Sequence, residues 1–510
     1  MATTTLDLAH EPEAVNALRK ALMKAATELF VRAASGASQR ELEEGVWQVV
    51  LALGRALLAA CMAVRCKAAT RAELSARDLE PQAVRLRLDR DYWGTQMSTF
   101  GPIKFPLFAY REEVGPATVT RTPAREQVVP LLGRCRSTPL CLEWEARLGK
   151  ELPFRRAAEA LGFFSHGAVD EEDTTLAAHA FVVGSIVDRS WLYRPVAEIR
   201  QILEDRAARD LSTGRPIVYL SQDAHAERRF VDKTWTAAWK SMNGLRFWTV
   251  DRKTGATIHL GGEYTWGDCN AVGAIVERLI VKGILPRDGD YGGGLRAELV
   301  IVTDGLPWIE GHVIAKLPWA HVVLDLYHAL QHLGHFTAKL HTASAAAASR
   351  LYRRFARFLA PERRDRERQP TARKGHKKGH RAAPESRAGF GSIGSLLEAL
   401  HKDRVELVAS GDEPFEALVA YLENNAYRAD YDVYRKRGFQ VGSGAMESLH
   451  RTAAQARLKL AGARWTPENS LALVNLRLLD LVGRWDEFWH HPDLNSLLRP
   501  AFAHVGVTPT

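Results

Sequence analysis

The chain has 510 residues, a net charge of +9 and a pI near 9.3, which allows about three domains and favours a polyanionic partner. Its 46% hydrophobic and 25% charged residues exclude a largely disordered chain. No apolar stretch reaches about 18 uncharged residues and no basic segment precedes an apolar one at the N-terminus, so neither a membrane span nor secretion is expected. Five irregularly spaced cysteines fit a reducing, cytoplasmic compartment.

The N-terminal region, residues 1–90, is predicted to be helical. Apolar residues recur at helical spacing within 14–22 and again within 42–64. Residues 91–200 begin differently, because Trp93–Phe100 and Ile103–Tyr110 flank the breaker Gly101-Pro102, which is typical of a β-hairpin.

A possible helix-turn-helix follows at 153–169. Gly162 would make its tight turn and Ser165 would cap its second helix. A DNA-reading helix carries basic or amide side chains at its start, whereas Asp170-Glu-Glu-Asp173 follows here. A structural helix pair is therefore favoured over DNA reading, although the region 91–200 stays a candidate DNA-end-binding region.

Residues 210–340 alternate strand and helix signals, which predicts an α/β fold with a mixed sheet flanked by helices. Strands are expected at Pro216–Gln222, Leu245–Val250, Ala256–Tyr264, Glu298–Thr303 and Ala320–Leu326, and helices at Asn270–Ile284, Pro307–Leu317 and from Tyr327 to Leu340. The turn chemistry of 251–255 joins the second and third strands.

Residues 341–438 break this alternation and are predicted to be an all-helical insertion. It contains a basic run at 361–385 that is almost free of apolar residues and is expected to be disordered. Residues 439–490 return with helices, including a basic amphipathic helix from Gly444 to about Leu460 and another at Glu468–Leu481. Residues 491–510 form a tail.

Three carboxylates stand in different local settings. Asp223 and Asp304 each end an apolar strand-like run, and Glu447 lies just inside a helix. Phosphoryl transfer with two divalent ions needs hard oxygen ligands gathered at one place, and strand ends and a crossing helix can supply them. Taken singly, each acid also fits an ordinary turn, cap or first-turn role, most clearly Asp304-Gly305.

A second polar group, Asp325 and His328, ends the last predicted strand. These residues are predicted to orient a metal ligand without binding the metal themselves, to position phosphate, or to act as a capping pair. His332 and His335 follow at a spacing similar to that of zinc ligands, but no Glu or Cys joins them as in a metalloprotease, so structural roles are favoured. The Cys135/Cys141 spacing also differs from Cys-x-x-Cys, which disfavours zinc.

At this point the chain resembles bacterial insertion-sequence transposases of the DDE class, closest to the ISKra-four family. The resemblance covers roughly residues 90–490. It rests on the following stretches: Val302-Thr-Asp304-Gly-Leu-Pro-Trp-Ile309, Val323-Leu-Asp325-Leu-Tyr-His328-Ala-Leu, Gly442-Ser-Gly-Ala-Met-Glu447-Ser, Arg457-Leu-Lys-Leu-Ala-Gly-Ala-Arg-Trp465 and Gly483-Arg-Trp-Asp-Glu-Phe-Trp489.

The resemblance implies an RNase H-like catalytic core with a helical insertion. It also implies that Asp223, Asp304 and Glu447 are the catalytic DDE acids and the ligands of two Mg²⁺ or Mn²⁺ ions. One departure concerns Asp223, which stands in Asp-Ala-His rather than the usual Asp-Gly, so Asp232 and Asp251 are fallback candidates. The first 90 residues match loosely, which leaves open whether they supply end recognition.

The expected function is a DNA transposase that cleaves at inverted-repeat ends and transfers the 3′-hydroxyl into target DNA. Double-stranded DNA is the expected partner, through these basic residues: Arg451, Arg457, Lys459, Arg464, Arg373, Lys374, Lys377 and Lys378. A homo-oligomer in the bacterial cytoplasm, associated with the nucleoid when DNA-bound, is expected from the family. Alternatives are an inactive or domesticated DNA-binding derivative and an RNase H-like nuclease without strand transfer.

Overall fold

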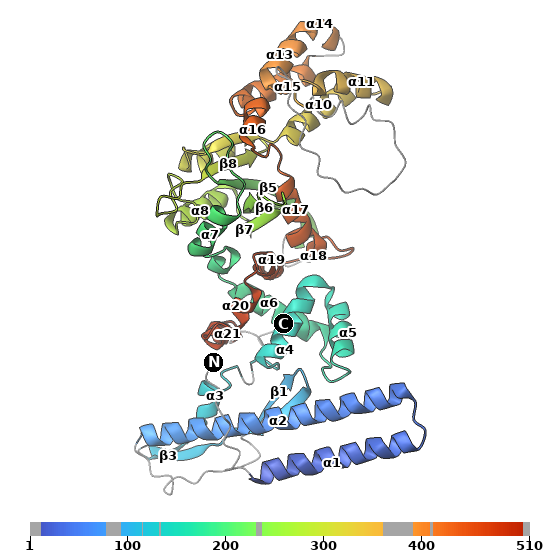
Figure 1. Ribbon diagram of the computed structural model, residues 1–510, viewed down its shortest axis with the longest axis vertical. Coiled ribbons are helices and arrows are strands. Elements are labelled where there is room, and N and C mark those ends of the chain that lie inside the picture. The colour runs from blue at the N-terminus through green and yellow to red at the C-terminus, as the bar shows by residue number, and fades with distance from the viewer. Residues whose placement is uncertain are drawn as a thin grey trace. The chain divides into compact units, whose positions relative to one another are not determined.

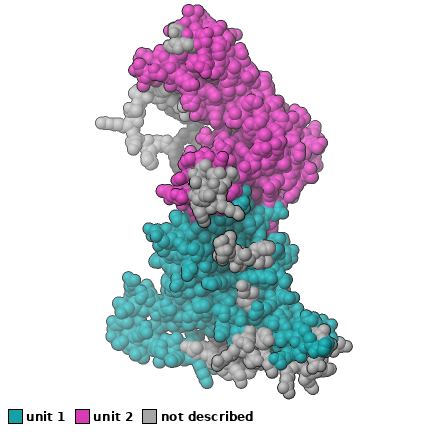
Figure 2. Space-filling model, turned by 180° about the vertical axis from the view of Figure 1, so that it is seen from behind, with its two compact units in different colours: residues 1–188, 468–510 teal, residues 189–467 magenta. Residues whose placement is uncertain are grey.

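The computed structural model describes residues 12–77, 93–114, 116–131, 134–230, 237–360, 391–408 and 412–502. These residues form two compact units (Figures 1 and 2). Unit 1 contains residues 1–188 and 468–510, and unit 2 contains residues 189–467. The division at 467/468 falls inside the segment 439–490 that the sequence groups with the end of the core. The predicted basic run at 361–385 lies outside the described residues.

Unit 1 begins with two long helices, α1 (Pro12–Ala34) and α2 (Gln39–Ala76), which run side by side in Figure 1. Ser38 caps α2 in a reciprocal capping box with Glu41, which satisfies two backbone groups at the helix start. By length and composition alone, α2 is apolar enough to cross a bilayer.

The predicted hairpin is confirmed as β1 (Trp93–Ser98) and β2 (Gly101–Pro106), an antiparallel pair. Gly101 adopts a φ of 104° at the turn, a conformation that favours glycine. A second pair follows, β3 (Tyr110–Val114) with β4 (Ala117–Arg121), and then the short helix α3 (Pro123–Gln127).

The remaining helices of unit 1 are α4 (Pro139–Glu151), α5 (Phe154–Phe164), α6 (Asp173–Ile186), α19 (Pro467–Leu481), α20 (Trp485–Trp489) and α21 (Leu494–Phe502). The predicted helix-turn-helix is wrong in its details. Gly162 lies inside α5, and Ser165 ends that helix instead of opening the next. The Ser165 hydroxyl accepts from Val169 N, and α6 begins eight residues later, at Asp173.

Unit 2 is mixed α/β, with a five-stranded mixed sheet flanked by helices, as predicted at that level. The strand order is β7-β6-β5-β8-β9. The strands are β5 (Ile217–Phe230), β6 (Ala237–Val250), β7 (Thr257–Thr265), β8 (Glu298–Thr303) and β9 (His321–Leu324). Strands β5, β6 and β7 pair antiparallel, whereas β8 lies parallel to both β5 and β9.

Both faces of the sheet are buried, which explains the continuous apolar sequence of β8. Ile217, Tyr219, Val300 and Val302 pack into a core with α10 (Leu326–Leu340) and the helices after it. The alternate residues of β5 and β8 are buried on the other face. Within the described part of unit 2, five short or medium helices precede β5 or separate the later strands along the chain: η3 (Arg189–Leu192), α7 (Val196–Asp205), α8 (Cys269–Val281), α9 (Trp308–His312) and η4 (Ile314–Lys316).

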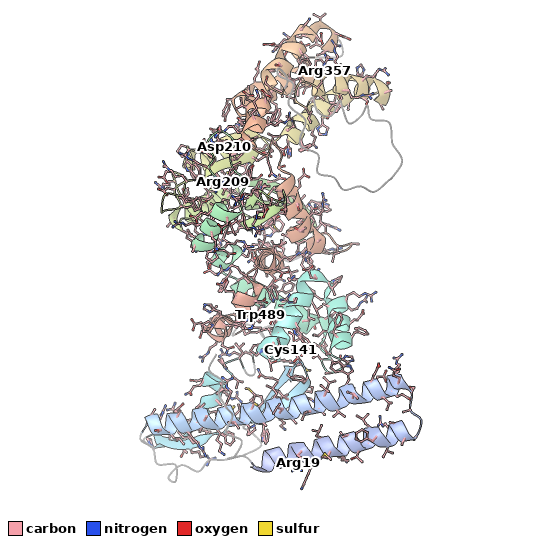
Figure 3. All side chains as sticks on the ribbon, viewed as in Figure 1. Arg19, Cys141, Arg209, Asp210, Arg357 and Trp489 are labelled. Atoms are coloured by element: carbon pink, nitrogen blue, oxygen red, sulfur yellow. The ribbon has the colours of Figure 1, made fainter. Side chains whose placement is uncertain are left out.

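The described helices between β9 and residue 438 are α10, α11 (Ala345–Ala356), α13 (Ile393–Lys402), α14 (Arg404–Leu407), α15 (Glu413–Asn425), η5 (Ala426–Arg428) and α16 (Tyr431–Arg437). An ion-pair network ties α16 to the sheet. Arg437 contacts Asp210 at 2.5 Å, the latter labelled in Figure 3, and approaches Glu298 of β8 at 3.7 Å. His321 of β9 joins Glu298 at 2.9 Å.

The predicted helix from Gly444 to Leu460 is present but irregular. It starts as α17 (Gly444–Leu449), widens into a π-helical segment, η6 (His450–Gln455), and ends as α18 (Ala456–Leu458). Such π segments are rare and occur often at functional sites.

Candidate functional site

Three aspartates follow the carboxyl ends of the three parallel strands. Asp304 and Asp325 come directly after β8 and β9, and Asp223 lies two residues beyond Ser221, the last β5 residue that pairs with β8. Because Ser221 pairs with Val302, Asp223 and Asp304 each lie two residues past that pair. The carboxyl edge of parallel strands is where open α/β sheets bind ligands.

The prediction that Asp223 ends its strand is wrong. Strand β5 continues to Phe230, because residues 219–230 pair with β6 along their whole length. Asp223 faces Gly244 of β6 in that ladder, and it lies two residues past Ser221, where the pairing of β5 with β8 ends.

The two leading acids influence each other electrostatically. Burial, together with the charge of Asp223, raises the pKa of Asp304 above its usual range. Two carboxylates that share a partly buried site repel each other when both are ionised. Asp304 also serves the turn that its Asp-Gly sequence indicates, since its Oδ1 accepts from Leu306 N at 3.1 Å.

Asp325 is completely buried and connects three segments. Its Oδ1 caps α10 by accepting from Tyr327 N at 2.7 Å, and its Oδ2 lies 2.9 Å from His328 Nδ1. The backbone N–H of Ser443 donates to the same Oδ2 at 3.1 Å, and so does the Ser443 hydroxyl. Burial opposes ionisation, but these hydrogen bonds outweigh it and lower the pKa of Asp325.

The protonation of His328 is coupled to the acids around it. The hydrogen bond to Asp325 is the main reason that its pKa is raised, and the charges of Asp223 and Asp304 add to the effect. The predicted pair Asp325 and His328 therefore lies beside Asp223 and Asp304 in space, and Asp325 also holds Ser443, the residue before α17.

Glu447 lies in the first turns of α17, and its side chain is exposed. Met446 next to it packs over β6, where a Cβ on Gly244 would come within 2.6 Å of the Met446 methyl group. Arg246 of β6 donates to the carbonyl of Ala445. These contacts hold α17 across the sheet beside Asp223, but the Glu447 carboxylate forms no ion pair with any residue that the structure describes.

His450 connects this helix to Asp223 and was missed by the sequence analysis. Its ring is buried, and its Nε2 lies 3.4 Å from Asp223 Oδ2. Its Nδ1 lies 3.0 Å from the hydroxyl of Tyr264. Because burial raises the pKa of Tyr264 well above its usual value, the phenol keeps its proton and can donate it to Nδ1. His450 Nε2, on the other side of the ring, faces Asp223 but makes no hydrogen bond among the described residues.

Two further buried groups were also missed. His225 Nε2 lies 2.9 Å from Glu227 Oε1, and the His225 ring lies 4.5 Å from the ring of His450. Burial lowers the pKa of His225. The alternation Asp223-x-His225-x-Glu227 was the available signal, because strand residues two apart share a face.

The predicted DNA-contacting residues divide by exposure. Arg451, Lys459 and Arg464 are exposed. Arg457, in contrast, is buried in this structure, and its guanidinium packs over the Trp465 ring at 5.0 Å. Arg373, Lys374, Lys377 and Lys378 lie outside the described residues.

The two fallback candidates for the first catalytic acid, Asp251 and Asp232, have different outcomes. Asp251 makes the β6–β7 turn, accepting from Lys253 N at 2.9 Å and pairing with Arg206 at 3.0 Å. The backbone N–H groups of Thr254 and Lys253 and the Arg206 side chain lower its pKa to about 2. It is therefore a turn residue. Asp232 lies outside the described residues.

Within the described ranges, no three His, Cys, Asp or Glu side chains are arranged so that they could hold a metal ion as they stand. His332 stacks on Tyr421 at 3.8 Å, which agrees with a structural role. In unit 1, Cys135 and Cys141 (the latter labelled in Figure 3) are buried beside Glu145 and His179, which form a 2.5 Å ion pair.

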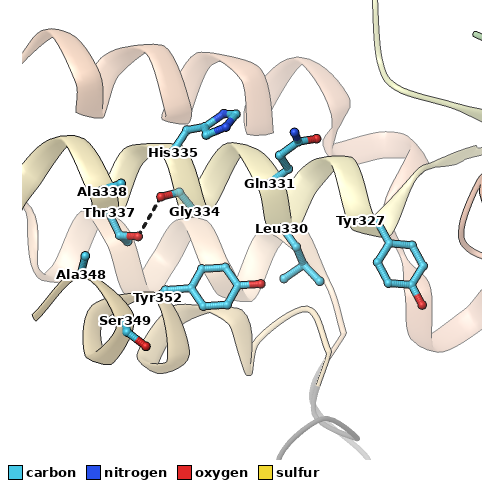
Figure 4. Close-up of a pocket in the computed structure, with 10 residues that line it drawn as sticks. All are labelled: Tyr327, Leu330, Gln331, Gly334, His335, Thr337, Ala338, Ala348, Ser349 and Tyr352. Carbon is cyan, nitrogen blue, oxygen red and sulfur yellow. Dashed lines mark hydrogen bonds between the residues drawn. The ribbon is translucent and has the colours of Figure 1, made fainter. Parts of the chain in front are cut away.

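A groove of about 460 Å³ runs between α10 and α11 (Figure 4). Leu330 and Tyr352 give it apolar walls, while Gln331 and His335 add polar groups. Tyr327 lies at the start of α10, directly before His328. The groove therefore adjoins the acidic edge but contains neither Asp223 nor Asp304.

The fold and the site define a mixed α/β protein with an acidic cluster at the carboxyl edge of its parallel strands. No protein-family model matches the chain, and the curated proteins contain no significant match to it.

Proposed function

We propose that this chain is a DNA transposase of the DDE type, with an RNase H-like core in unit 2. The observation that carries the proposal is the placement of Asp223 and Asp304 on neighbouring parallel strands, with the helix of Glu447 packed beside them on β6 and its His450 3.4 Å from Asp223. Three antiparallel strands followed by two parallel ones, in the order β7-β6-β5-β8-β9, support the RNase H-like assignment. The helices between β9 and α17 would be its insertion.

The donor chemistry fits divalent cations. Asp223 and Asp304 are hard oxygen donors. Burial, and after it the charge of Asp223, raises the pKa of Asp304, and a bound cation would offset both effects. Asp223, Asp304 and the exposed carboxylate of Glu447 would hold two Mg²⁺ or Mn²⁺ ions. Bound there, such ions would stabilise the attacking and leaving oxygens of a phosphodiester.

The chain's own residues would position these acids. His450, whose Nε2 lies 3.4 Å from Asp223 Oδ2, would help to orient that oxygen, as partners of metal-ligating groups commonly do, while Asp223 Oδ1 accepts from Ala224 N at 2.7 Å. Asp325 would fix the start of α17 through Ser443. His328, whose pKa is raised, would supply a positive charge next to the phosphate.

The exposed cations near Glu447 would bind the DNA backbone. Arg451 follows Glu447 by one helical turn, and Lys459 and Arg464 come shortly after it. Binding through such contacts would weaken as salt rises, because each phosphate contact releases counterions.

The test is cleavage of DNA carrying the sequences that flank the coding region. Asp304→Asn should abolish Mg²⁺-dependent cleavage and retain DNA binding, because it removes a charge without changing shape. Asp288→Asn, in an exposed loop of the same unit, is the matched control and should cleave normally. Full cleavage by Asp304→Asn would refute the assignment.

A joining assay with pre-cut ends separates the alternatives. A transposase should transfer the 3′-hydroxyl into target DNA. Cleavage without joining would indicate a nuclease, and DNA binding without either activity would indicate a domesticated DNA-binding protein.

A further inference from the structure

The α1–α2 hairpin of unit 1 exposes an unusual amount of apolar surface. None of the α1 side chains that the structure describes is buried. Nine large apolar side chains on the two helices are between 36% and 75% exposed: Leu22, Met23, Phe30, Val31, Val46, Trp47, Val50, Leu57 and Val64. Clustered exposed apolar residues mark interaction surfaces, whereas scattered single ones do not.

The spacing of these residues fits a helical partner. Val50, Leu57 and Val64 follow one another at intervals of seven residues, and so do Met23 and Phe30. Apolar residues repeated every seven positions form a stripe along one face of a helix, and two such stripes pack knobs-into-holes. The stripe therefore matches another helix better than a globular surface.

A lipid bilayer fits this surface less well, although α2 is long and apolar enough to cross one. Arg55, in the middle of α2, donates to the carbonyl of Phe100 at 2.9 Å. A Cβ on Gly54 would meet the Phe100 ring at 2.5 Å, and Cys66 packs into a core with Ile103 of β2. One side of α2 is thus covered by protein, so lipid could not surround the helix.

The charges on α2 favour a second copy in antiparallel orientation. Glu41, Glu43 and Glu44 lie at the start of the helix, and the exposed Arg65 lies toward its end. If Val50 of one copy faces Leu57 of the other, Glu43 of each copy comes within one residue of Arg65 in its partner. A two-fold axis repeats that contact on both sides.

We propose that the α1–α2 hairpin is a homodimerisation surface, formed by two antiparallel copies of α2 with α1 alongside. The helices are about 57 and 35 Å long and about 10 Å wide, so their combined face is on the order of 900 Å². A stable interface needs about 800 Å² per partner. The proposal is independent of DNA cleavage, and its test needs no DNA.

The test measures the molar mass of the full-length chain by size-exclusion chromatography with light scattering. The wild type should elute as a dimer or a multiple of it. Val50→Glu combined with Leu57→Glu should reduce that mass by half, with an unchanged circular dichroism spectrum. Val281→Glu combined with Val405→Glu, at two strongly exposed sites in unit 2, is the matched control and should keep the wild-type mass.

A charge swap tests the orientation without adding charge to the apolar stripe. Glu43→Arg and Arg65→Glu should each weaken self-association at least tenfold, and the two together should restore it. A wild type that stays monomeric at micromolar concentration would overturn the proposal, as would an undiminished mass in the Val50/Leu57 variant. Co-flotation of the wild type with vesicles of phosphatidylethanolamine and phosphatidylglycerol would overturn it in favour of a membrane.

Discussion

Replacing Asp325 with alanine is the sharpest test of how the site is held together. The carboxylate is fully buried and accepts from Tyr327 N, from His328 and from both the backbone and the hydroxyl of Ser443. Its loss leaves these donors without an acceptor inside the protein. It also separates the end of β9 from the residue that opens α17.

The expected cost follows from the kind of interaction that the substitution removes. Removing one partner from a buried, charged hydrogen-bonded pair costs about 3–5 kcal/mol. Ser443→Ala removes only one charge-assisted hydrogen bond and should cost about 1.5–3 kcal/mol. In the Asp325→Ala background the Ser443 substitution should cost much less, because its acceptor has already gone.

The pH dependence has a definite sign on each side. The folded-state pKa of Asp325 is lowered, so its contribution is present above about pH 3.9 and disappears as pH falls through the folded value. The folded-state pKa of His328 is raised, so its contribution is full below about pH 6.5 and disappears as pH rises through the folded value. The difference between wild type and Asp325→Ala should therefore be largest between about pH 4 and 6.5.

Urea unfolding followed by circular dichroism provides the measurement. Asp268→Ala is the control, because Asp268 caps α8 through Asn270 N and Ala271 N, and all its hydrogen bonds within the described part of the chain go to the start of that helix. It should cost only about 1 kcal/mol. If Asp325→Ala costs no more than Asp268→Ala, Asp325 is merely a helix cap and the argument that it positions α17 fails.

Three further predictions concern packing and charge. Gly184→Ala should lower stability by at least about 1–3 kcal/mol in chemical denaturation, because its Cβ would lie 2.2 Å from the backbone oxygen of Ala472. Gly162→Ala should be neutral or slightly stabilising, because its Cβ would make only an ordinary 3.7 Å contact with the backbone oxygen of Val169. Asp304→Asn should raise the melting temperature at pH 7 but not near pH 3, since the raised folded-state pKa makes its ionised form unfavourable. Tyr264→Phe should cost about 1–3 kcal/mol in urea titrations by leaving His450 Nδ1 unpaired.

The local sequence predicted the structure correctly where the burial of a short apolar run determines it. Strand β8 runs over Glu298–Thr303 as predicted, because a short run that is apolar on both faces has few alternatives to a central strand. Asp325 and His328 were also placed correctly at the end of β9, since a polar pair after such a strand marks the edge of the sheet.

The sequence did not predict features that depend on contacts between distant parts of the chain. The apolar run before Asp223 stops at Gln222, but β5 continues, because its ladder with β6 needs only backbone groups. Arg457 carries a charge that suggests the surface, yet the Trp465 ring provides a buried cation–π partner. The link between His450 and Asp223 joins two residues that are far apart in the chain, and it leaves no local pattern in the sequence.

The π-helical segment at His450–Gln455 changes the helical register between α17, which carries Glu447, and α18, which follows it. A π segment accommodates one extra residue, so everything after it is rotated by about 100° relative to an unbroken α-helix. Deleting one residue there would turn Arg457 away from Trp465 while leaving Glu447 upstream in place. The register of this one turn thus lets a single helix keep Glu447 exposed near its start and bury Arg457 near its end, two requirements that uniform α-helical pitch would set in conflict.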